Sequence, residues 1–439
     1  MIFSSLEFLI FWGLAIFLAR FKVFNSLTAI GLIGLAFYSF QGYLNFFILF
    51  YVYLICTLSV FLKSKIPILI FLVLLPLIII KYLNFIFVNV LHLNLDLQFI
   101  NQIEIPPGLS FISFSAIALI IYLRNNTENY KTKLAYLYFF PQLIAGPIVE
   151  PKSLIPQLKN KLINQNLEIL RGLFIFSVGI FLKVLFADNI GQYIDPIFSN
   201  LSDHNINQKL IALFLFSQQI FFDFNGYTLM AIGVGITLGI KLPENFNAPY
   251  LSQSISDFWK KWHITLSNWI KNYVYIPMGG SRTGIYQSYV NIFIAMLISG
   301  IWHGAGYNFL IWGSLHGLII ILEKNFLNNL LLKIPVYFRI LYSYLLVTFL
   351  WLFFRLNDLV DIEIFFANEN DDVINLTLVF FVIAILFLNF CQKFITLRYL
   401  SSLFEKFNKY FSVTFSIIVV LVCIILSKGS SEKFIYFNF

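Results

Sequence analysis

Two stretches decide what this chain is: Trp259-Lys260-Lys261-Trp262-His263 and Ser299-Gly300-Ile301-Trp302-His303-Gly304. Residues 259–316 hold three of the five histidines and five of the seven tryptophans, whereas the rest of the chain is mostly leucine, isoleucine and phenylalanine. Histidine exchanges protons near neutral pH, and burying it among membrane segments is costly. The sequence therefore predicts that the chemistry lies here.

The composition is that of a membrane protein. Of the 439 residues, 59% are hydrophobic and only 11% are charged, and the mean hydropathy is +0.84. A soluble domain of this size could not cover so much apolar surface. The three cysteines lie inside apolar runs, and the histidines lack metal-ligand spacing, so we expect neither disulfides nor a metal site. The net charge of +8 is mild, and we expect no nucleic-acid partner.

Apolar runs of membrane-crossing length predict an all-α polytopic fold with about eleven or twelve transmembrane helices, plus re-entrant and interfacial helices. The runs begin near residues 6, 27, 45, 66, 108, 172, 210, 288, 305, 337, 374 and 411. No repeat or hydrophilic domain interrupts them, so residues 1–439 are expected to form a single membrane domain. The first run is expected to be a retained helix, since it lacks the flanks of a cleaved signal.

The charges between the runs predict the topology. Basic clusters such as Lys63/Lys65 alternate with acid-rich stretches such as Asp188–Asp203, and basic loops stay in the cytoplasm. We therefore expect the N-terminus to lie outside the cytoplasm, and residues 259–282 to face it.

Two segments depart from the simple pattern. Leu134–Val149 has basic flanks at both ends and contains Gln142 between Pro141 and Gly146. It reads as a re-entrant turn that lines a pocket, or equally as a span kinked at proline. In Leu251–Pro277, apolar and polar residues mix at helical spacing, which predicts one amphipathic helix in the cytoplasmic interface with its tryptophans at headgroup depth.

Polar residues inside apolar runs mark the expected site. Asp223 and Asn225 must face a cavity or a partner, either as a structural hydrogen-bond network or in catalysis, with orientation of a histidine as a third role. We expect His303 to be catalytic, and rate His316 as structural. Because the sequence shows no nucleophile elbow or phosphate loop, the simplest chemistry is a neutral histidine that removes the proton of an attacking hydroxyl.

Four basic residues lie near the cytoplasmic end of this stretch: Lys260, Lys261, Lys271 and Arg282. They could bind the phosphates of a nucleotide-bearing thioester, although ordinary positive-inside anchoring explains each of them equally well.

Taken in order, these motifs resemble those of the membrane-bound O-acyltransferase family, in particular its bacterial branch of alginate-, peptidoglycan- and teichoic-acid-modifying proteins. The matching blocks, spread over most of the chain, are Phe3–Phe8, Pro107–Phe111, Phe140–Pro147, Phe222–Tyr227, Leu242–Phe246, Asp257–His263, Tyr275–Gly280, Ser299–Gly304, Trp312–Gly313 and Phe434–Phe439.

The resemblance implies a funnel with His303 at its constriction and His263 as the second histidine. Asp223, Asn225, Trp302 and Gln142 would then shape and orient the pocket. An acyl group, acetyl in the first instance, would pass from a cytoplasmic acyl-CoA or acyl-carrier thioester to a hydroxyl presented from the other side of a bacterial cell (inner) membrane. The implied acceptor is an extracytoplasmic glycan or a partner acyltransferase, and acetyl-CoA would be a substrate, with no cofactor bound.

Two other functions stay open. One is D-alanyl transfer from a carrier protein to teichoic acid. The other is transport of a lipid-linked or acylated glycan intermediate, because transporters also have broken membrane segments and intramembrane polar groups.

Overall fold

The structure is a computed structural model. It describes the whole chain except residues 1–2, 21–25, 41, 94–102, 104, 161–165, 283, 357, 368–375, 428–434 and 436–439. The aromatic block Phe434–Phe439 of the sequence analysis, apart from Ile435, lies outside the described residues.

The contacts divide the chain into two compact units. Unit 1 comprises Met1–Phe181, Gly226–Pro243 and Phe404–Asn438, and unit 2 comprises Leu182–Asn225 and Glu244–Leu403. The single membrane domain expected from the sequence stays a prediction. The long helix α12 (Ile206–Thr237) contributes its first part to unit 2 and its last part to unit 1.

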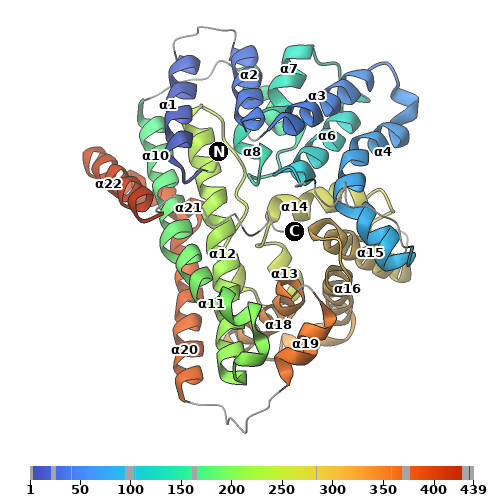
Figure 1. The fold of residues 1–439 in the computed structure, drawn as a ribbon, viewed down its shortest axis with the longest axis vertical. Coiled ribbons are helices and arrows are strands. Elements are labelled where there is room, and N and C mark those ends of the chain that lie inside the picture. The colour runs from blue at the N-terminus through green and yellow to red at the C-terminus, as the bar shows by residue number, and fades with distance from the viewer. Residues whose placement is uncertain are drawn as a thin grey trace. The chain divides into compact units, whose positions relative to one another are not determined.

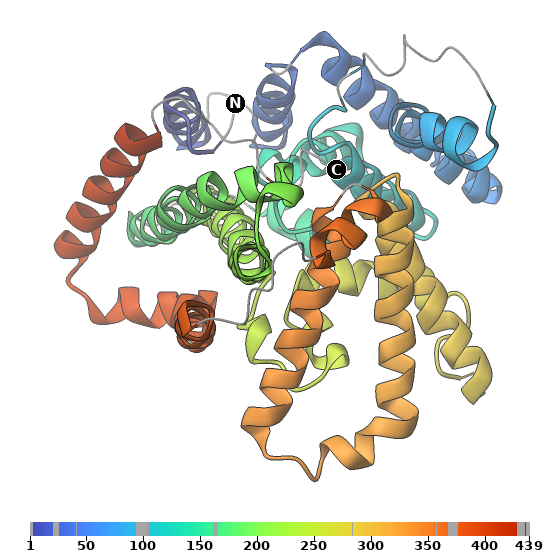
Figure 2. The same ribbon diagram turned by 60° about the horizontal axis from the view of Figure 1, so that its bottom comes forward.

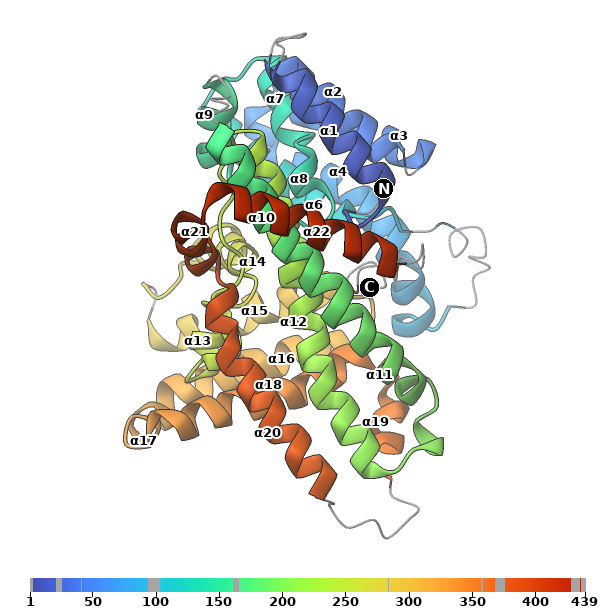
Figure 3. The same ribbon diagram turned by 90° about the vertical axis from the view of Figure 1, so that its left-hand side faces the viewer.

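Unit 1 is a group of helices in which α2 packs beside α7, and α22 crosses α10 (Figures 1 and 3). Its α-helices are α1 (Leu6–Arg20), α2 (Ser26–Ser39), α3 (Tyr43–Leu58), α4 (Ile66–Leu77), α6 (Leu109–Leu123), α7 (Tyr130–Leu137), α8 (Phe140–Leu143), α9 (Pro151–Lys159), α10 (Asn166–Phe181), residues 226–237 of α12, and α22 (Lys409–Ser427). Shorter helical segments are η1 (Lys63–Lys65), η2 (Ile78–Tyr82) and η3 (Phe85–Val90).

Unit 2 contains residues 259–316, which hold three of the histidines and five of the tryptophans. Its α-helices are α11 (Asn189–Ser199), residues 206–225 of α12, α13 (Ile255–Trp259), α14 (Ile264–Ile270), α15 (Ile285–His303), α16 (Tyr307–Leu322), α17 (Asn328–Leu331), α18 (Val336–Arg355), α19 (Leu359–Phe366), α20 (Leu376–Cys391) and most of α21 (Leu397–Lys406). Between them lie η4 (Leu182–Asp188), η5 (Leu201–Asp203), η6 (Pro249–Leu251), η7 (Lys271–Tyr275), η8 (Glu323–Leu327) and η9 (Gln392–Ile395). Figure 2 shows α16 and α18, both in shades of orange, running side by side.

The helices confirm an all-helical protein of the multi-pass membrane type. Among the described residues, eight helices are long and apolar enough to cross a membrane, and four further apolar helices are shorter. The eight are Lys63–Tyr82, Glu168–Ser199, Ile206–Thr237, Ile285–His303, Tyr307–Leu327, Val336–Arg355, Leu378–Ile395 and Lys409–Ser427, and the shorter ones are Leu6–Leu18, Leu27–Ser39, Tyr43–Leu58 and Leu109–Leu123. Together they correspond to the twelve apolar runs of the sequence.

The distribution of side chains suits a lipid environment. On α20 the large apolar residues Phe380 and Phe387 are exposed, whereas Asn389 on the same helix is buried. The Asn389 amide oxygen accepts a hydrogen bond from the Gln218 amide of α12 at 3.0 Å. Because hydrocarbon cannot satisfy polar groups, a membrane protein turns them toward its own interior.

The segment Leu134–Val149 is not one kinked helix. Helix α7 ends at Leu137, the four-residue α8 follows, and residues 144–149 are non-helical although all of them are buried. The Gln142 amide caps this break by donating to the Tyr136 carbonyl at 2.8 Å. A break of this kind needs shielding by protein, which the burial provides. Whether the segment enters and leaves by one face stays a prediction.

One part of the charge pattern was misread. Asp188 and Asp195 were assigned to an acid-rich connection, yet they lie on the helical segments η4 and α11. Asp188 pairs with Lys183 at 2.6 Å, and Asp195 pairs with Arg355 at 2.6 Å. These acids neutralise buried or half-buried cations and therefore say little about topology. The orientation of the N-terminus stays a prediction.

Candidate active site

Residues 251–277 form two short helices, and the prediction of one amphipathic helix was wrong. Helix α13 stops at Trp259, α14 starts at Ile264, and His263 between them has a left-handed backbone with φ of 42°. Trp259 and Trp262 are buried, so they pack in the protein core, and their expected headgroup depth stays a prediction. Ser254 is the residue that caps α13, since its hydroxyl accepts from the Asp257 N–H at 3.0 Å.

The break fixes the His263 side chain. Its Nδ1 lies 3.2 Å from the Asn245 side-chain oxygen, which also accepts the Thr265 backbone N–H at 3.1 Å. A backbone N–H can only donate, so this Asn245 atom is the acceptor, and the proton between Asn245 and His263 sits on Nδ1. His263 Nε2 is therefore the unprotonated nitrogen, which is the form that a proton acceptor needs.

The environment keeps His263 neutral. Its ring is fully buried and packs against Phe224 at a centroid distance of 4.6 Å, and this burial lowers the pKa of His263 to about 3. In the unfolded chain the same group would titrate near about 6.5.

The free energy of unfolding should therefore fall as the pH falls from about 6.5 toward 3, because the unfolded chain then binds a proton that the folded chain refuses. His263→Gln keeps a donor for Asn245 but does not titrate. We expect the variant to lose stability less steeply over this range, by up to about 1.4 kcal/mol per pH unit. Unfolding curves of both proteins in detergent at several pH values test this, and equal slopes would contradict it.

His303 is held by the close packing of α15 and α16, which lie side by side in Figure 1. A Cβ on Gly300 would lie 2.3 Å from the Phe309 carbonyl oxygen and 3.0 Å from the Gly313 Cα. The two backbones can approach this closely only because both positions lack side chains. Helix α15 ends at His303 itself, so the buried ring lies where the helix turns back into α16.

Aromatic rings surround His303 and connect the histidines. Its ring centroid lies 4.7 Å from Trp302 and 5.0 Å from Trp312. Trp302 also lies 6.0 Å from His263, so one indole contacts both predicted catalytic histidines. Trp312 in turn lies 4.7 Å from His316. The structure thus brings the three predicted site residues His263, Trp302 and His303 together, and their roles in catalysis stay predictions.

A pocket of about 280 Å³ lies on the helices that carry this cluster, although His263, Trp302 and His303 do not line it. Its walls are mostly apolar and come from α13, α14, η7, α15 and α16. Ser299 lies on the wall one helical turn before His303, and its buried hydroxyl has no protein hydrogen-bond partner among the described residues. Trp259 is also on the wall, 5.7 Å from Trp312, which contacts His303. Ser299 is therefore the part of the pocket wall that comes nearest to His303 along α15.

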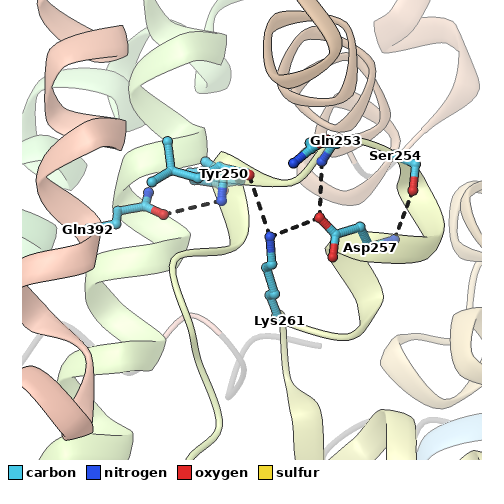
Figure 4. Close-up of polar contacts among 7 residues, drawn as sticks. Tyr250, Gln253, Ser254, Asp257, Lys261 and Gln392 are labelled. Atoms are coloured by element: carbon cyan, nitrogen blue, oxygen red, sulfur yellow. Dashed lines mark hydrogen bonds and ion pairs between the residues drawn. The ribbon is translucent and has the colours of Figure 1, made fainter. Parts of the chain in front are cut away.

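Two of the four predicted phosphate-binding residues line this pocket. Lys260 and Lys271 are on its wall and exposed. Lys261 instead pairs with Asp257 at 2.8 Å, and Arg282 is exposed and is not on the wall (Figure 4 shows Lys261). An apolar cavity with two exposed lysines suits an anionic ligand that has an apolar arm.

Asp223 belongs to an ion-pair triad. The Lys183 ammonium lies 2.7 Å from Asp223 and 2.6 Å from Asp188, and Asp223 and Lys183 are both buried. This arrangement resembles the structural network that the sequence allowed as one alternative. The catalytic and orienting roles stay predictions, although Phe224, the next residue of α12, packs on His263. Asn225 is buried on the same helix, and Gln142 is a residue of unit 1.

Sequence reasoning overlooked two neighbours of the predicted site residues. Asn245 orients His263, and its only signal was its place in the block Leu242–Phe246. Lys183 was also overlooked. A single lysine inside an apolar run, here Phe181–Phe186, indicates that the lysine is paired with a buried acid.

The family model and the relatives that match this chain agree on one family. The model of the membrane-bound O-acyltransferase family matches residues 123–356. A peptidoglycan O-acetyltransferase of Helicobacter pylori is 43% identical over 230 residues, which are 51% of this chain and 44% of that protein. A probable alginate O-acetylase AlgI of Azotobacter vinelandii is 36% identical over 264 residues, 59% of this chain and 52% of that one. A teichoic acid D-alanyltransferase of Bacillus subtilis is 27% identical over 226 residues, 48% and 57% of the two chains.

The chain thus spans about half the length of the curated relatives that it matches. The family match includes His263, His303, the Asn245 contact and the lysine-lined pocket. Since it also covers more than half of the sequence, the chain belongs to the membrane-bound O-acyltransferase family.

Proposed function

We propose that this chain is a membrane O-acyltransferase that moves acetyl from cytoplasmic acetyl-CoA toward an extracytoplasmic polysaccharide. The observation that carries the proposal is the pocket with Lys260, Lys271 and Ser299 on its wall, together with the His263–Trp302–His303 cluster, whose His303 lies one helical turn after Ser299. The lysines would hold the donor phosphates, and the apolar walls would take the pantetheine arm. The thioester would then lie toward His303.

His303 acts as the general base in this proposal. Its neutral ring accepts the proton of the acceptor hydroxyl while that oxygen attacks the thioester carbonyl carbon. The carbon–sulfur bond breaks when the tetrahedral intermediate collapses, and the proton passes from His303 to the thiolate. The products are an ester and free thiol, and His303 returns to its neutral form. His263, fixed by Asn245, assists as a second base or by binding.

The acceptor and the cellular context are proposed from the relatives. Those named above modify peptidoglycan, alginate and teichoic acid. We propose a glycan hydroxyl or an extracytoplasmic acyltransferase partner as acceptor, the bacterial inner membrane as location, and an N-terminus outside the cytoplasm. Acetyl-CoA is a substrate here, and no bound cofactor takes part.

The donor site can be tested through its lysines. Lys260→Ala and Lys271→Ala should each raise KM for the acyl donor by about fivefold to tenfold, because a charge-assisted contact to phosphate is lost. Arg282→Ala is the matched control, since Arg282 is exposed and not on the pocket wall. Initial rates at several donor concentrations measure this. A larger rise for Arg282→Ala than for both lysine variants would contradict the assigned site.

The same acyl-donor assay distinguishes two alternative functions. D-alanyl transfer from a carrier protein would show as activity with an aminoacyl carrier and none with acetyl-CoA. A transporter of a glycan intermediate would move that intermediate without cleaving a thioester.

A further inference from the structure

Helix α13 is too short to be stable by itself, so the surrounding protein must hold it. It has five residues, and an isolated helix needs about 12–15 residues to form in water. Yet it carries Trp259 in the pocket wall and is followed directly by Lys260. Whatever fixes α13 also fixes the wall of the pocket.

Every N–H at the start of α13 has a partner. Asp257 N–H donates to the Ser254 hydroxyl, and Phe258 N–H donates to the Ser254 carbonyl at 2.9 Å. The Asp257 carboxylate accepts the Gln253 N–H at 3.1 Å (Figure 4). The first two N–H groups of the helix remain, and local residues do not satisfy them.

Glu323 satisfies these two groups from a distant part of the chain. Its carboxylate oxygens accept the Ile255 N–H at 2.9 and 3.0 Å, and one of them accepts the Ser256 N–H at 3.3 Å. Glu323 is only 4% exposed, and the Tyr342 hydroxyl of α18 also bonds to it. A negative charge at a helix N-terminus is favourable, so this contact is both a cap and an electrostatic anchor.

The other end of α13 is held from the same helix. The Trp259 indole N–H donates to His316 Nδ1 at 3.2 Å. His316 and Glu323 are seven residues apart, which places them two turns apart on one face of the α16–η8 helix. That face therefore contacts α13 at both of its ends.

We infer that Glu323 and His316 form a clamp that fixes α13, and that Glu323 is a positioning residue for the acyl-donor pocket. This inference rests on the proposed function for its kinetic consequence, but not for the clamp itself. His303 is held separately, by α15, by the close contact of Gly300 with Gly313 and by the Phe354 ring of α18. Loss of the clamp should therefore loosen donor binding and leave the chemical step largely intact.

The clamp is tested first by hydrogen–deuterium exchange of the purified chain of residues 1–439 in detergent. In Glu323→Gln and Glu323→Ala, amides of the peptide that contains Ile255 and Ser256 should exchange about tenfold faster or more, while α15 amides keep their protection. Glu363→Gln, which alters an exposed glutamate of α19, should change neither. If Glu323→Ala does not accumulate, Glu323→Gln still weakens the cap and is measured instead. Unchanged exchange at residues 255–256 would overturn the clamp.

The second measurement concerns the pocket. For Glu323→Gln, KM for the acyl donor should rise about tenfold while kcat at saturating donor changes less than about twofold, because uniform binding is lost. A fall in kcat with unchanged KM would overturn the positioning role. Absence of acyl transfer by the unmodified chain would instead overturn the proposed function, and the exchange experiment would still decide whether the clamp exists.

Discussion

Replacing His303 by alanine is expected to lower the rate of acyl transfer by about 100-fold to 10,000-fold, the usual contribution of a general base. The buried ring lies at the end of α15 among Trp302, Trp312 and Phe354. Removing the His303 ring alone takes away the proposed base, so the acceptor hydroxyl keeps its proton and attacks the thioester more slowly. The measurement is acyl product formed per unit of protein, with the amount of protein in the membrane determined in parallel.

His204→Ala is the matched control, because His204 lies in the connection that follows η5, away from this cluster in the sequence. It should leave the rate unchanged. Retained acyl transfer in His303→Ala would contradict the assignment of the base. Loss of the protein from the membrane would be resolved by His303→Gln, which conserves more of the volume and should accumulate while remaining inactive.

Replacing Lys183 by methionine is expected to destabilise the protein by about 3–5 kcal/mol, as when one partner of a buried ion pair is removed. The ammonium of Lys183 lies between two carboxylates, at 2.6 Å from Asp188 and 2.7 Å from Asp223. Without it, two acids face each other with no cation between them. A large fall in the unfolding temperature of the purified protein would show this.

Lys333→Met, at an exposed lysine of the same unit, should have little effect. Asp188→Asn and Asp223→Asn combined with Lys183→Met should recover much of the loss, since the unpaired charges are then gone.

Asp223→Asn alone distinguishes a catalytic from a structural role of Asp223. A stable but inactive variant would indicate a catalytic role, and a destabilised variant with normal activity per folded molecule would indicate a structural one. An unchanged unfolding temperature for Lys183→Met would contradict the triad.

The sequence predicted the fold well because hydropathy alone identifies membrane helices. The short helices α1, α2, α3 and α6 and the eight longer spans all coincide with apolar runs. The sequence-based prediction failed where the burial of individual side chains does not follow the helical spacing of apolar residues. The helical spacing of residues 251–277 could not reveal that Trp262 enters the core or that His263 takes a left-handed backbone.

Part of the candidate site could be proposed from the sequence. His263, Trp302 and His303 stand out because histidine and tryptophan are rare in this chain and occur there together, and the structure places them side by side. The sequence could not tell which of the neighbouring lysines lines the pocket. Lys260 and Lys261 differ only in the structure, where Lys261 pairs with Asp257. Glu323 could not be predicted at all. A glutamate at a helix end is ordinary, and its partners lie 67 and 68 residues away.

The central claim is that this chain cleaves an acyl thioester and transfers the acyl group to a hydroxyl. The most direct test supplies acyl-CoA, labelled in the acyl group, to membranes that contain the chain and a hydroxyl-bearing cell-surface glycan. The account predicts release of free CoA together with labelled ester on the acceptor, and neither in membranes that contain His303→Ala. Movement of a glycan intermediate across the membrane with no thioester cleaved would contradict it.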